Sequence, residues 1–427
     1  MKILSYTIIG ICIVWSASSF AQDTSSTYDR RLAELEKQVQ SLTEKTEKTD
    51  RKFGLFKSGK SKFLLRGFFH SGFAGVITED EADYNFAGGS INPVLLYKQS
   101  DRLFFEAEFE GGFTPEGEFE WGMGYGNMSV IVNKYLTVRG GKFLVPFGTF
   151  GEKLHPAWIN KTATTPLGFG HDGLVPSSDY GIELRGAFNI GPTKWNYQAY
   201  VINGPQLKIG DDEPEEAGML KFDFLKDNNP DKAVGGRIGF FPLSNSSLEL
   251  GVSAMTAGVG DKDGPYSKVR ANLFAADLNY VKSLNFMKSV LDIKGQYNYS
   301  QVSDANYAVP NDTTDLFYDF NNVSSSYYVQ LALKPSLVNN NFARRLEFVG
   351  RYSGMQTPEG SLWEQNATQW TVGINYWLDW RTVLKFGYQN SSSTAGGDDH
   401  GEEKSPGGGS SGPGAEHMFY VHWAIGF

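Results

Sequence analysis

From Lys62 onward, hydrophobic and polar side chains alternate with a period of two residues. In one such segment, Leu103 and Phe105 alternate with Glu106 and Glu108. This period indicates β-strands, whose successive side chains point to opposite faces of a sheet. Similar alternation recurs at 63–73, 182–188, 195–201, 248–252, 291–299, 327–333, 346–352 and 370–376. Because a soluble β-sandwich alternates in the same way, the period alone does not identify the fold.

The connections between these strands alternate between long and short. The long or acidic connections lie near 78–83, 146–178, 203–232, 258–268, 303–321, 354–366 and 390–416. The short connections lie near 100–101, 133–135, 191–193, 242–246, 283–288, 335–342 and 379–380. Membrane β-barrels have this arrangement, with short periplasmic turns and long outer loops. We therefore predict an all-β fold, a transmembrane antiparallel β-barrel of about 16 strands within residues 61–427.

The chain ends on a strand with an unbroken apolar face, made of Phe419, Val421, Trp423, Ile425 and Phe427. Such a strand must pair with the first strand to close a barrel. A terminal phenylalanine after alternating apolar residues resembles the sorting signal of bacterial outer-membrane barrels. We therefore expect the protein in the bacterial outer membrane. An even number of strands places the N-terminus on the periplasmic side, together with the C-terminus.

One connection differs from the others. A strand that contains Arg139 stops at Pro146, because proline cannot donate to a sheet ladder. The residues that follow, to about 178, are rich in Gly, Pro and polar types, yet include Trp158 and Phe169. A long irregular segment with large apolar side chains needs a semi-enclosed place to lie. We predict a constriction loop at about 146–178, after the fifth strand, folded into the barrel.

The N-terminal part has two predicted segments. Residues 1–21 have the charged start, apolar stretch and small-residue cleavage site of a secretory signal peptide, with the cut before Gln22. The only cysteine, Cys12, lies within it, so an exported chain would have no disulfide. Within 22–60, a heptad pattern (Leu32, Leu35, Val39, Leu42) predicts a periplasmic helix. Both a single amphipathic helix and a short coiled coil fit this pattern.

Charge and hydropathy narrow the function only slightly. The 427-residue chain has a formal net charge of −9, which becomes −10 once Lys2 leaves with the signal peptide. This balance argues against nucleic-acid binding. After the first 20 residues no apolar run reaches the roughly 18 residues of a membrane-spanning helix.

The segment GKFLVPFGTFGEKLHPAWINK, residues 141–161, carries a family resemblance. Together with the signal, the N-terminal helix and the terminal phenylalanine, it resembles the phosphate-selective porins O and P and related bacterial outer-membrane porins. The likeness covers most of 62–427 and is specific mainly around 141–161; elsewhere it is one of architecture. It implies a sixteen-stranded barrel, usually a homotrimer, with a long loop after the fifth strand folded inward as a constriction. The basic residues that give the family its phosphate specificity have no residue-by-residue match here.

Charged side chains are the candidates for solute selection, because such groups select by charge and size at short range. The constriction candidates in the loop are Glu152, Lys153, His155, Lys161, His171 and Asp172. The pore-wall candidates are Arg66, His70, Arg102, Glu106, Glu108, Arg139, Lys142, Arg185, Arg345 and Arg351. Alternatively, some of the loop charges pair with each other or anchor the loop to the wall.

Arg139 and Lys142 are three residues apart, so a regular strand would place them on opposite faces. A bulge at Gly140–Gly141 would bring both inward. Without a bulge, one of them points toward lipid or a neighbouring subunit.

The sequence gives weaker support for metal binding or catalysis. Acidic residues at 211–216 and 398–403 are ligand types for Ca²⁺ or Mg²⁺, but they lack glycine-pivoted ligand spacing and fit solvated loops better. Nucleotide-binding and nucleophile-elbow motifs are absent from the sequence. Glu106, Glu108 and Glu110 share a face and suit a lumen lining better than a glycosidase pair. We expect no enzyme activity, cofactor or metal.

Three functions are compatible with these observations. The first is an outer-membrane porin that passes small hydrophilic or anionic solutes by diffusion, with a weak anion preference. Such a porin would be a homotrimer surrounded by outer-membrane lipid. The second is a barrel that acts as a scaffold or conduit for periplasmic and surface partners. The third is a secreted soluble glycan-binding β-protein. Channel conductance in a planar bilayer distinguishes the first from the others.

Overall fold

The computed structural model describes residues 57–58, 61–78, 82–114, 117–170, 173–211, 213–222, 227–310, 316–394 and 414–427. The chain divides into two compact units, Met1–Leu64 and Leu65–Phe427. The predicted signal peptide and heptad helix lie outside the described residues. So do His171, Asp172 and the acidic stretch 398–403.

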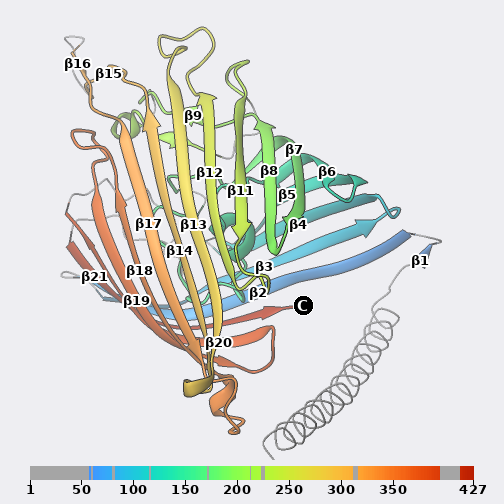
Figure 1. The fold of residues 1–427 in the computed structure, drawn as a ribbon. Coiled ribbons are helices and arrows are strands. Elements are labelled where there is room, and N and C mark those ends of the chain that lie inside the picture. Colours follow the sequence, from blue (N-terminus) through green and yellow to red (C-terminus); the bar gives the residue numbers. More distant parts are fainter. Residues whose placement is uncertain are drawn as a thin grey trace, which may run out of the picture. The chain divides into compact units, whose positions relative to one another are not determined.

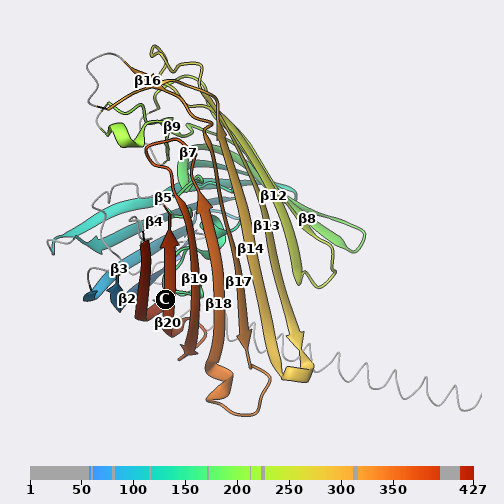
Figure 2. The ribbon, with the colours of Figure 1, turned by 90° about the vertical axis from the view of Figure 1, so that its left-hand side faces the viewer.

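Among the described residues, 16 antiparallel strands form one closed barrel (Figure 1). They are β2 (Ser61–Ile77), β3 (Ala82–Lys98), β4 (Leu103–Phe113), β5 (Phe119–Asn133), β6 (Leu136–Leu144), β7 (Ser178–Ile190), β8 (Thr193–Ile202), β11 (Ala233–Phe241), β12 (Leu248–Gly258), β13 (Arg270–Leu284), β14 (Ser289–Val302), β17 (Val323–Lys334), β18 (Leu346–Gln356), β19 (Asn366–Trp377), β20 (Thr382–Ser393) and β21 (Gly414–Gly426). Each strand pairs with its neighbour in this order, as Figure 2 shows for β17 to β20. The last strand, β21, pairs with β2, so Phe69 lies opposite Ile425 and the sheet closes. The predicted all-β transmembrane barrel is confirmed.

The remaining described elements are short. They are the strands β1 (Lys57–Ser58), β9 (Gln206–Leu207), β10 (Leu220–Lys221), β15 (Tyr307–Ala308) and β16 (Phe317–Tyr318), and the single-turn helices η1 (Phe150–Leu154), η2 (Pro214–Glu216), η3 (Asn285–Met287) and η4 (Ala343–Arg345). Among the described residues, no helix is long and apolar enough to cross a membrane.

The barrel has an inverted distribution of polar and apolar side chains. On β12 and β13, Val252 is 60% exposed and Phe274 is 52% exposed, whereas Ser253 and Asp277 are buried. In a soluble protein the apolar side chains would be buried instead. An outward apolar band around a polar interior is the arrangement of a barrel whose outer surface meets lipid.

The long connections are packed together at one end of the strands, where Figure 1 shows β15 and β16. Their shared core contains Val145, Phe147, Leu207, Phe222, Tyr307, Phe320 and Trp363. A hydrogen bond from Trp363 Nε1 to the carbonyl oxygen of Ala217, 3.0 Å long, links two of these connections. One connection on this side, at 114–118 between β4 and β5, was absent from the sequence-based assignment.

Candidate functional site

The connection between β6 and β7, residues 145–177, follows the fifth strand of the barrel, as predicted. The Val145 N–H donates to the carbonyl oxygen of Ser177 at 3.0 Å and so closes the base of the connection. Gly148 adopts a positive φ of 66°, and a Cβ atom there would lie 2.1 Å from the side chain of Gln296. Only glycine fits this turn, because a side chain would be strained and would collide with the barrel wall.

The backbone of this loop is hydrogen-bonded to side chains of distant strands. Gly148 N–H donates to Ser253 Oγ on β12 at 3.0 Å. The N–H groups of Thr149 and Phe150 donate to Gln296 Oε1 on β14, at 2.9 and 3.1 Å. Irregular backbone needs partners for its N–H groups, and the polar face of the wall supplies them.

Two cations on β18 and β20 hold the second half of the loop. Arg351, a predicted wall residue, donates to Thr164 twice, to its Oγ1 at 2.6 Å and to its carbonyl oxygen at 2.8 Å. Lys385 donates to the carbonyl oxygens of Ala157 at 2.6 Å and Asn160 at 2.8 Å. Both cations are almost fully buried. They therefore anchor the loop rather than present a charge to solvent.

The first half of the loop joins a network of arginines and glutamates. Arg185 donates to Glu152 Oε1 at 2.5 Å, and Arg139 Nη2 lies 3.8 Å from the same oxygen. Arg139 is also paired with Glu183, a fully buried carboxylate on β7. Buried charges are costly unless they are paired, so this network is built as a unit.

Lys153, the next charge of the loop, is paired with another strand of the wall. Its Nζ lies 3.0 Å from Glu249 Oε1 on β12. Glu249 also accepts from Arg237 at 3.0 Å, and Arg237 in turn donates to Asp277 at 2.6 Å. The side chain of Lys153 is nevertheless 39% exposed, so its charge is both paired and accessible.

The two other described loop candidates also have partners. Lys161 Nζ is 2.6 Å from Glu347 Oε1 and 3.9 Å from Asp292 Oδ2. His155 Nε2 lies 3.7 Å from Glu108 Oε1, an ion pair only when the imidazole is protonated. The alternative in which loop charges anchor the loop to the wall thus matches the observed contacts.

A cavity of about 500 Å³ lies between the loop and the wall. The charged side chains that line it are Arg66, Glu106, Glu108, Arg139, Glu152, Lys153, His155, Arg185 and Arg381. All of these except Arg381 were candidates from the sequence. Among the described residues, neither Arg66 nor Arg381 has a carboxylate at ion-pair distance, whereas Arg139, Lys153 and Arg185 are paired. Arg381 lies over the ring of Trp380, 4.3 Å from its centroid.

Two wall candidates are not in the wall, which corrects the sequence analysis. Arg102 is exposed in the turn before β4, where its N–H donates to Ser100 Oγ at 3.3 Å. Arg345 lies in η4, in the turn before β18. In both cases the strand begins later than the alternation suggested, after a hydrogen-bonded turn. His70 is on the wall, with Nδ1 3.2 Å from Nε2 of His422.

Arg139 and Lys142 lie on a strand without a bulge between them, which is the second of the two predicted arrangements. The register of β6 with both neighbours is regular through Gly140 and Gly141. Arg139 therefore points inward and Lys142 lies on the opposite face. Lys142 Nζ donates to the carbonyl oxygen of Met123 at 3.1 Å. This bond and other contacts stabilise the Lys142 ammonium group, whose charge would otherwise be costly on the outer face.

Sequence reasoning missed most partners of these charges, namely Glu183, Arg237, Glu249, Asp277, Glu347 and Lys385. The sequence did contain a signal for these partners, because each of them occupies the polar face of its strand. Glu347 and Arg351, for example, are four residues apart on β18 and share that face. The period of two does not say which strand lies opposite the loop.

No group of three His, Cys, Asp or Glu side chains is close enough to hold a metal ion in the part of the chain that the structure describes. In the acidic stretch near 211–216, Glu213 and Glu216 are paired with Lys208.

No family model matches the chain, and no curated protein matches it significantly. Solved structures do resemble it. The anion-selective porin from Comamonas acidovorans is 14% identical over 86% of this chain and 100% of that protein, with a TM-score of 0.54. The outer membrane channel DcaP of Acinetobacter baumannii is 10% identical, covers 87% and 99%, and has a TM-score of 0.52. Outer-membrane expressed OmpT of Vibrio cholerae is 10% identical, covers 87% and 99%, and has a TM-score of 0.50. At these identities the likeness establishes the fold, which is the β-barrel of these outer-membrane proteins.

Proposed function

We propose that this protein is an outer-membrane porin through which small hydrophilic solutes diffuse passively. One observation carries the proposal. The connection after the fifth strand is hydrogen-bonded to the polar faces of β12, β14, β18 and β20, beside a cavity lined by charges from loop and wall. We infer that this loop folds inward and narrows a water-filled barrel.

The charges of the cavity support a weak preference for anions. Cations from Arg66, Arg139, Lys153, Arg185 and Arg381 face carboxylates from Glu106, Glu108 and Glu152. The buried carboxylates Glu183 and Glu249 offset two of the cations. Cations and carboxylates are therefore equal in number, and the preference rests on Arg66 and Arg381, which among the described residues have no carboxylate at ion-pair distance. The lining has no dense cluster of unpaired cations that would favour phosphate over other small anions. Phosphate is therefore one candidate solute among several.

We also propose that the protein is a homotrimer in the bacterial outer membrane, with a periplasmic N-terminus. The outward apolar band supports a location in lipid. The short turns, such as 134–135 and 191–192, support the assignment of that end to the periplasm. The heptad pattern at 32–42 would assist assembly.

Planar-bilayer conductance of the purified, folded protein tests the function. Folding is checked first by heat-modifiable migration on a gel, and heat-unfolded protein is the control. We expect stepwise channels from the folded sample only, and a reversal potential in a salt gradient that is slightly anion-selective. Folded protein without channels would refute the porin proposal and favour a scaffold. A soluble protein that needs no detergent would refute the membrane barrel as well.

A further inference from the structure

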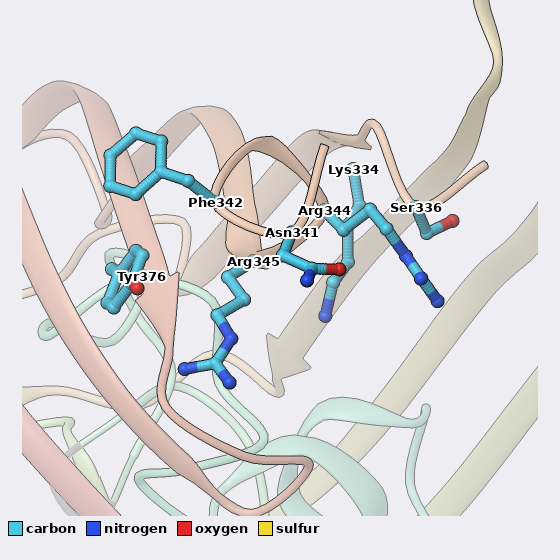
Figure 3. A pocket seen from close by; sticks show the side chains of 7 residues that line it. All are labelled: Lys334, Ser336, Asn341, Phe342, Arg344, Arg345 and Tyr376. Carbon is cyan, nitrogen blue, oxygen red and sulfur yellow. The ribbon is translucent and has the colours of Figure 1, made fainter. Parts of the chain in front are cut away.

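The turn between β17 and β18, residues 335–345, forms a second pocket of about 620 Å³ (Figure 3). The side chains that line it and matter here are Lys334, Asn341, Phe342, Arg344, Arg345 and Tyr376. The pocket lies at the short-turn end of the strands, and it shares no lining residue with the cavity beside the loop. It is therefore a separate feature of the molecule.

The turn carries two consecutive arginines, Arg344 and Arg345, and both line the pocket. Asn340 Oδ1 accepts from the N–H groups of Phe342 at 2.9 Å and Ala343 at 3.0 Å, and so fixes the turn that leads into η4. The Arg344 N–H donates to the carbonyl oxygen of Asn340 at 3.0 Å. Figure 3 shows the side chains of Arg344 and Arg345 extending from this turn on the same side as Lys334 and Asn341.

These cations are not neutralised within the protein. No acidic side chain lines the pocket, and within the described part of the chain neither Arg344 nor Arg345 has a carboxylate at ion-pair distance. Glu347, the first acidic residue after them, is bonded to Lys161 at 2.6 Å. Most arginines of the wall, such as Arg237, are instead paired with carboxylates. The pocket thus carries positive charge without a neutralising carboxylate, and it is suited to bind an anion.

The other side of the pocket is aromatic and faces outward. The rings of Phe342 and Tyr376 lie 5.5 Å apart, and Phe342 is 61% exposed. Tyr376 lies opposite Leu346, and the next outward pair along the same strands is Phe348 with Ile374, both exposed. The aromatic side therefore continues into the apolar band that meets lipid.

We propose that this pocket binds a phosphate group, presented by the head group of an anionic phospholipid at the membrane surface. Arginine forks match the geometry of phosphate oxygens, and juxtamembrane cations attract anionic lipids. Free phosphate has the same oxygens but gains nothing from the aromatic side. Acyl chains would follow Phe342, Tyr376 and Ile374 along the outer face. The inference rests on the membrane barrel and not on solute passage.

Native mass spectrometry of the full-length protein with dioleoyl-phosphatidylglycerol tests this site. We expect wild-type protein to retain the lipid, and the double variant Arg344→Gln/Arg345→Gln to bind it roughly 10- to 30-fold more weakly. The matched control removes two exposed cations from other short-turn ends, Lys134→Gln/Lys282→Gln, and should retain the lipid like the wild type. Equal retention by the wild type and the arginine variant would overturn the proposal. Heat-modifiable migration verifies that each variant is folded.

Two further measurements distinguish a bound lipid head group from bound free phosphate. Inorganic phosphate at millimolar concentration should displace little lipid from the wild type. Phe342→Ala should weaken retention of phosphatidylglycerol, since the ring supports the acyl chains. Binding of inorganic phosphate without binding of phosphatidylglycerol would overturn the head-group assignment. Because conductance is not a readout, this outcome is independent of the porin proposal.

Discussion

At the scale of single residues, most charges between loop and wall occur as pairs. Glu152, Lys153 and Lys161 each have an oppositely charged partner on a strand. Pairing is expected, because an unpaired charge in a poorly hydrated interior would be expensive. The paired charges shape the local field but largely cancel at a distance. The net preference then depends on the few cations that have no partner.

Arg66 is the residue at which we expect the largest effect on selectivity. Arg66→Glu should shift the reversal potential toward cations, because it replaces an uncompensated positive charge on the cavity lining. Arg66→Gln should shift it about half as far, since the charge changes by one unit rather than two.

The matched control for this prediction is Arg102→Glu, which changes an exposed turn arginine outside the cavity lining. The measurement is the zero-current potential of single channels across a salt gradient. If Arg102→Glu shifts the potential as much as Arg66→Glu, the lining does not determine selectivity.

Residue faces were largely predictable from the sequence. The period of two correctly placed Glu106, Glu108 and Arg185 on the face that lines the cavity. It failed for Arg102 and Arg345, which lie in turns just before the first residues of β4 and β18. Strand ends depend on turn hydrogen bonds, such as those accepted by Asn340 Oδ1 before η4, which leave no trace in the alternation.

At the scale of elements, the described part of the loop 145–177 is held at its base and in both of its halves. Its base is closed by Val145 and Ser177, its first half bonds to Gln296, and its second half bonds to Arg351 and Lys385. The position of this loop after the fifth strand followed from the sequence. The cations that hold it did not, because Lys385 is more than 200 residues away from the carbonyl groups it binds.

Removal of the Lys385 ammonium group should loosen the loop. Hydrogen bonds to charged donors contribute about 1.5–3 kcal/mol each, and Lys385→Met removes three of them. We expect a larger and noisier single-channel conductance. Lys142→Met, on the outward face, should leave the conductance unchanged. A Lys385→Met channel that is as quiet and as narrow as the wild type would show that this anchor is dispensable.

The aromatic core of the long loops should respond to high pH. Burial raises the pKa of Tyr307, in β15, to about 12. The neutral phenol is therefore favoured in the folded loops, and its stabilising effect is complete below a pH of about 10. It is lost as the pH rises through about 12, because the unfolded loop ionises first.

Near-ultraviolet circular dichroism as a function of pH measures this effect. Tyr307→Phe keeps the stacking on Phe320, whose ring centroid is 5.4 Å away, but removes the ionisable group. The variant should keep its aromatic signal to higher pH than the wild type. Identical titrations of the two proteins would contradict the role given to Tyr307.

At the scale of the whole molecule, stability depends on the contrast between the two faces of one sheet. Val252 and Phe274 are exposed on the outer face, and Ser253 and Asp277 are buried on the inner face. A lipid environment makes this arrangement favourable, since the apolar band meets hydrocarbon and the polar groups bond to each other.

A charge in the outer band should therefore destabilise the folded barrel in lipid. Val252→Arg is expected to lower the free energy of unfolding by about 2–4 kcal/mol. Leu243→Arg is the control, because Leu243 is an exposed apolar residue in a short turn rather than in a strand, and its cost should be about 0–1 kcal/mol. Denaturant titrations in vesicles, followed by tryptophan fluorescence, give both values. Equal costs at the two positions would argue against lipid contact at Val252.

The sequence by itself determined most of the strands, their two faces, most of the order of long and short connections and the place of the interrupted strand after Arg139. These properties are local, since they follow from neighbouring residues and from the period of a strand. Only the tertiary structure decided which charges meet. Arg139 and Glu183 are 44 residues apart, and Lys161 and Glu347 are 186 apart. Closure of the barrel brings them together, and no local pattern encodes which inner faces lie opposite each other.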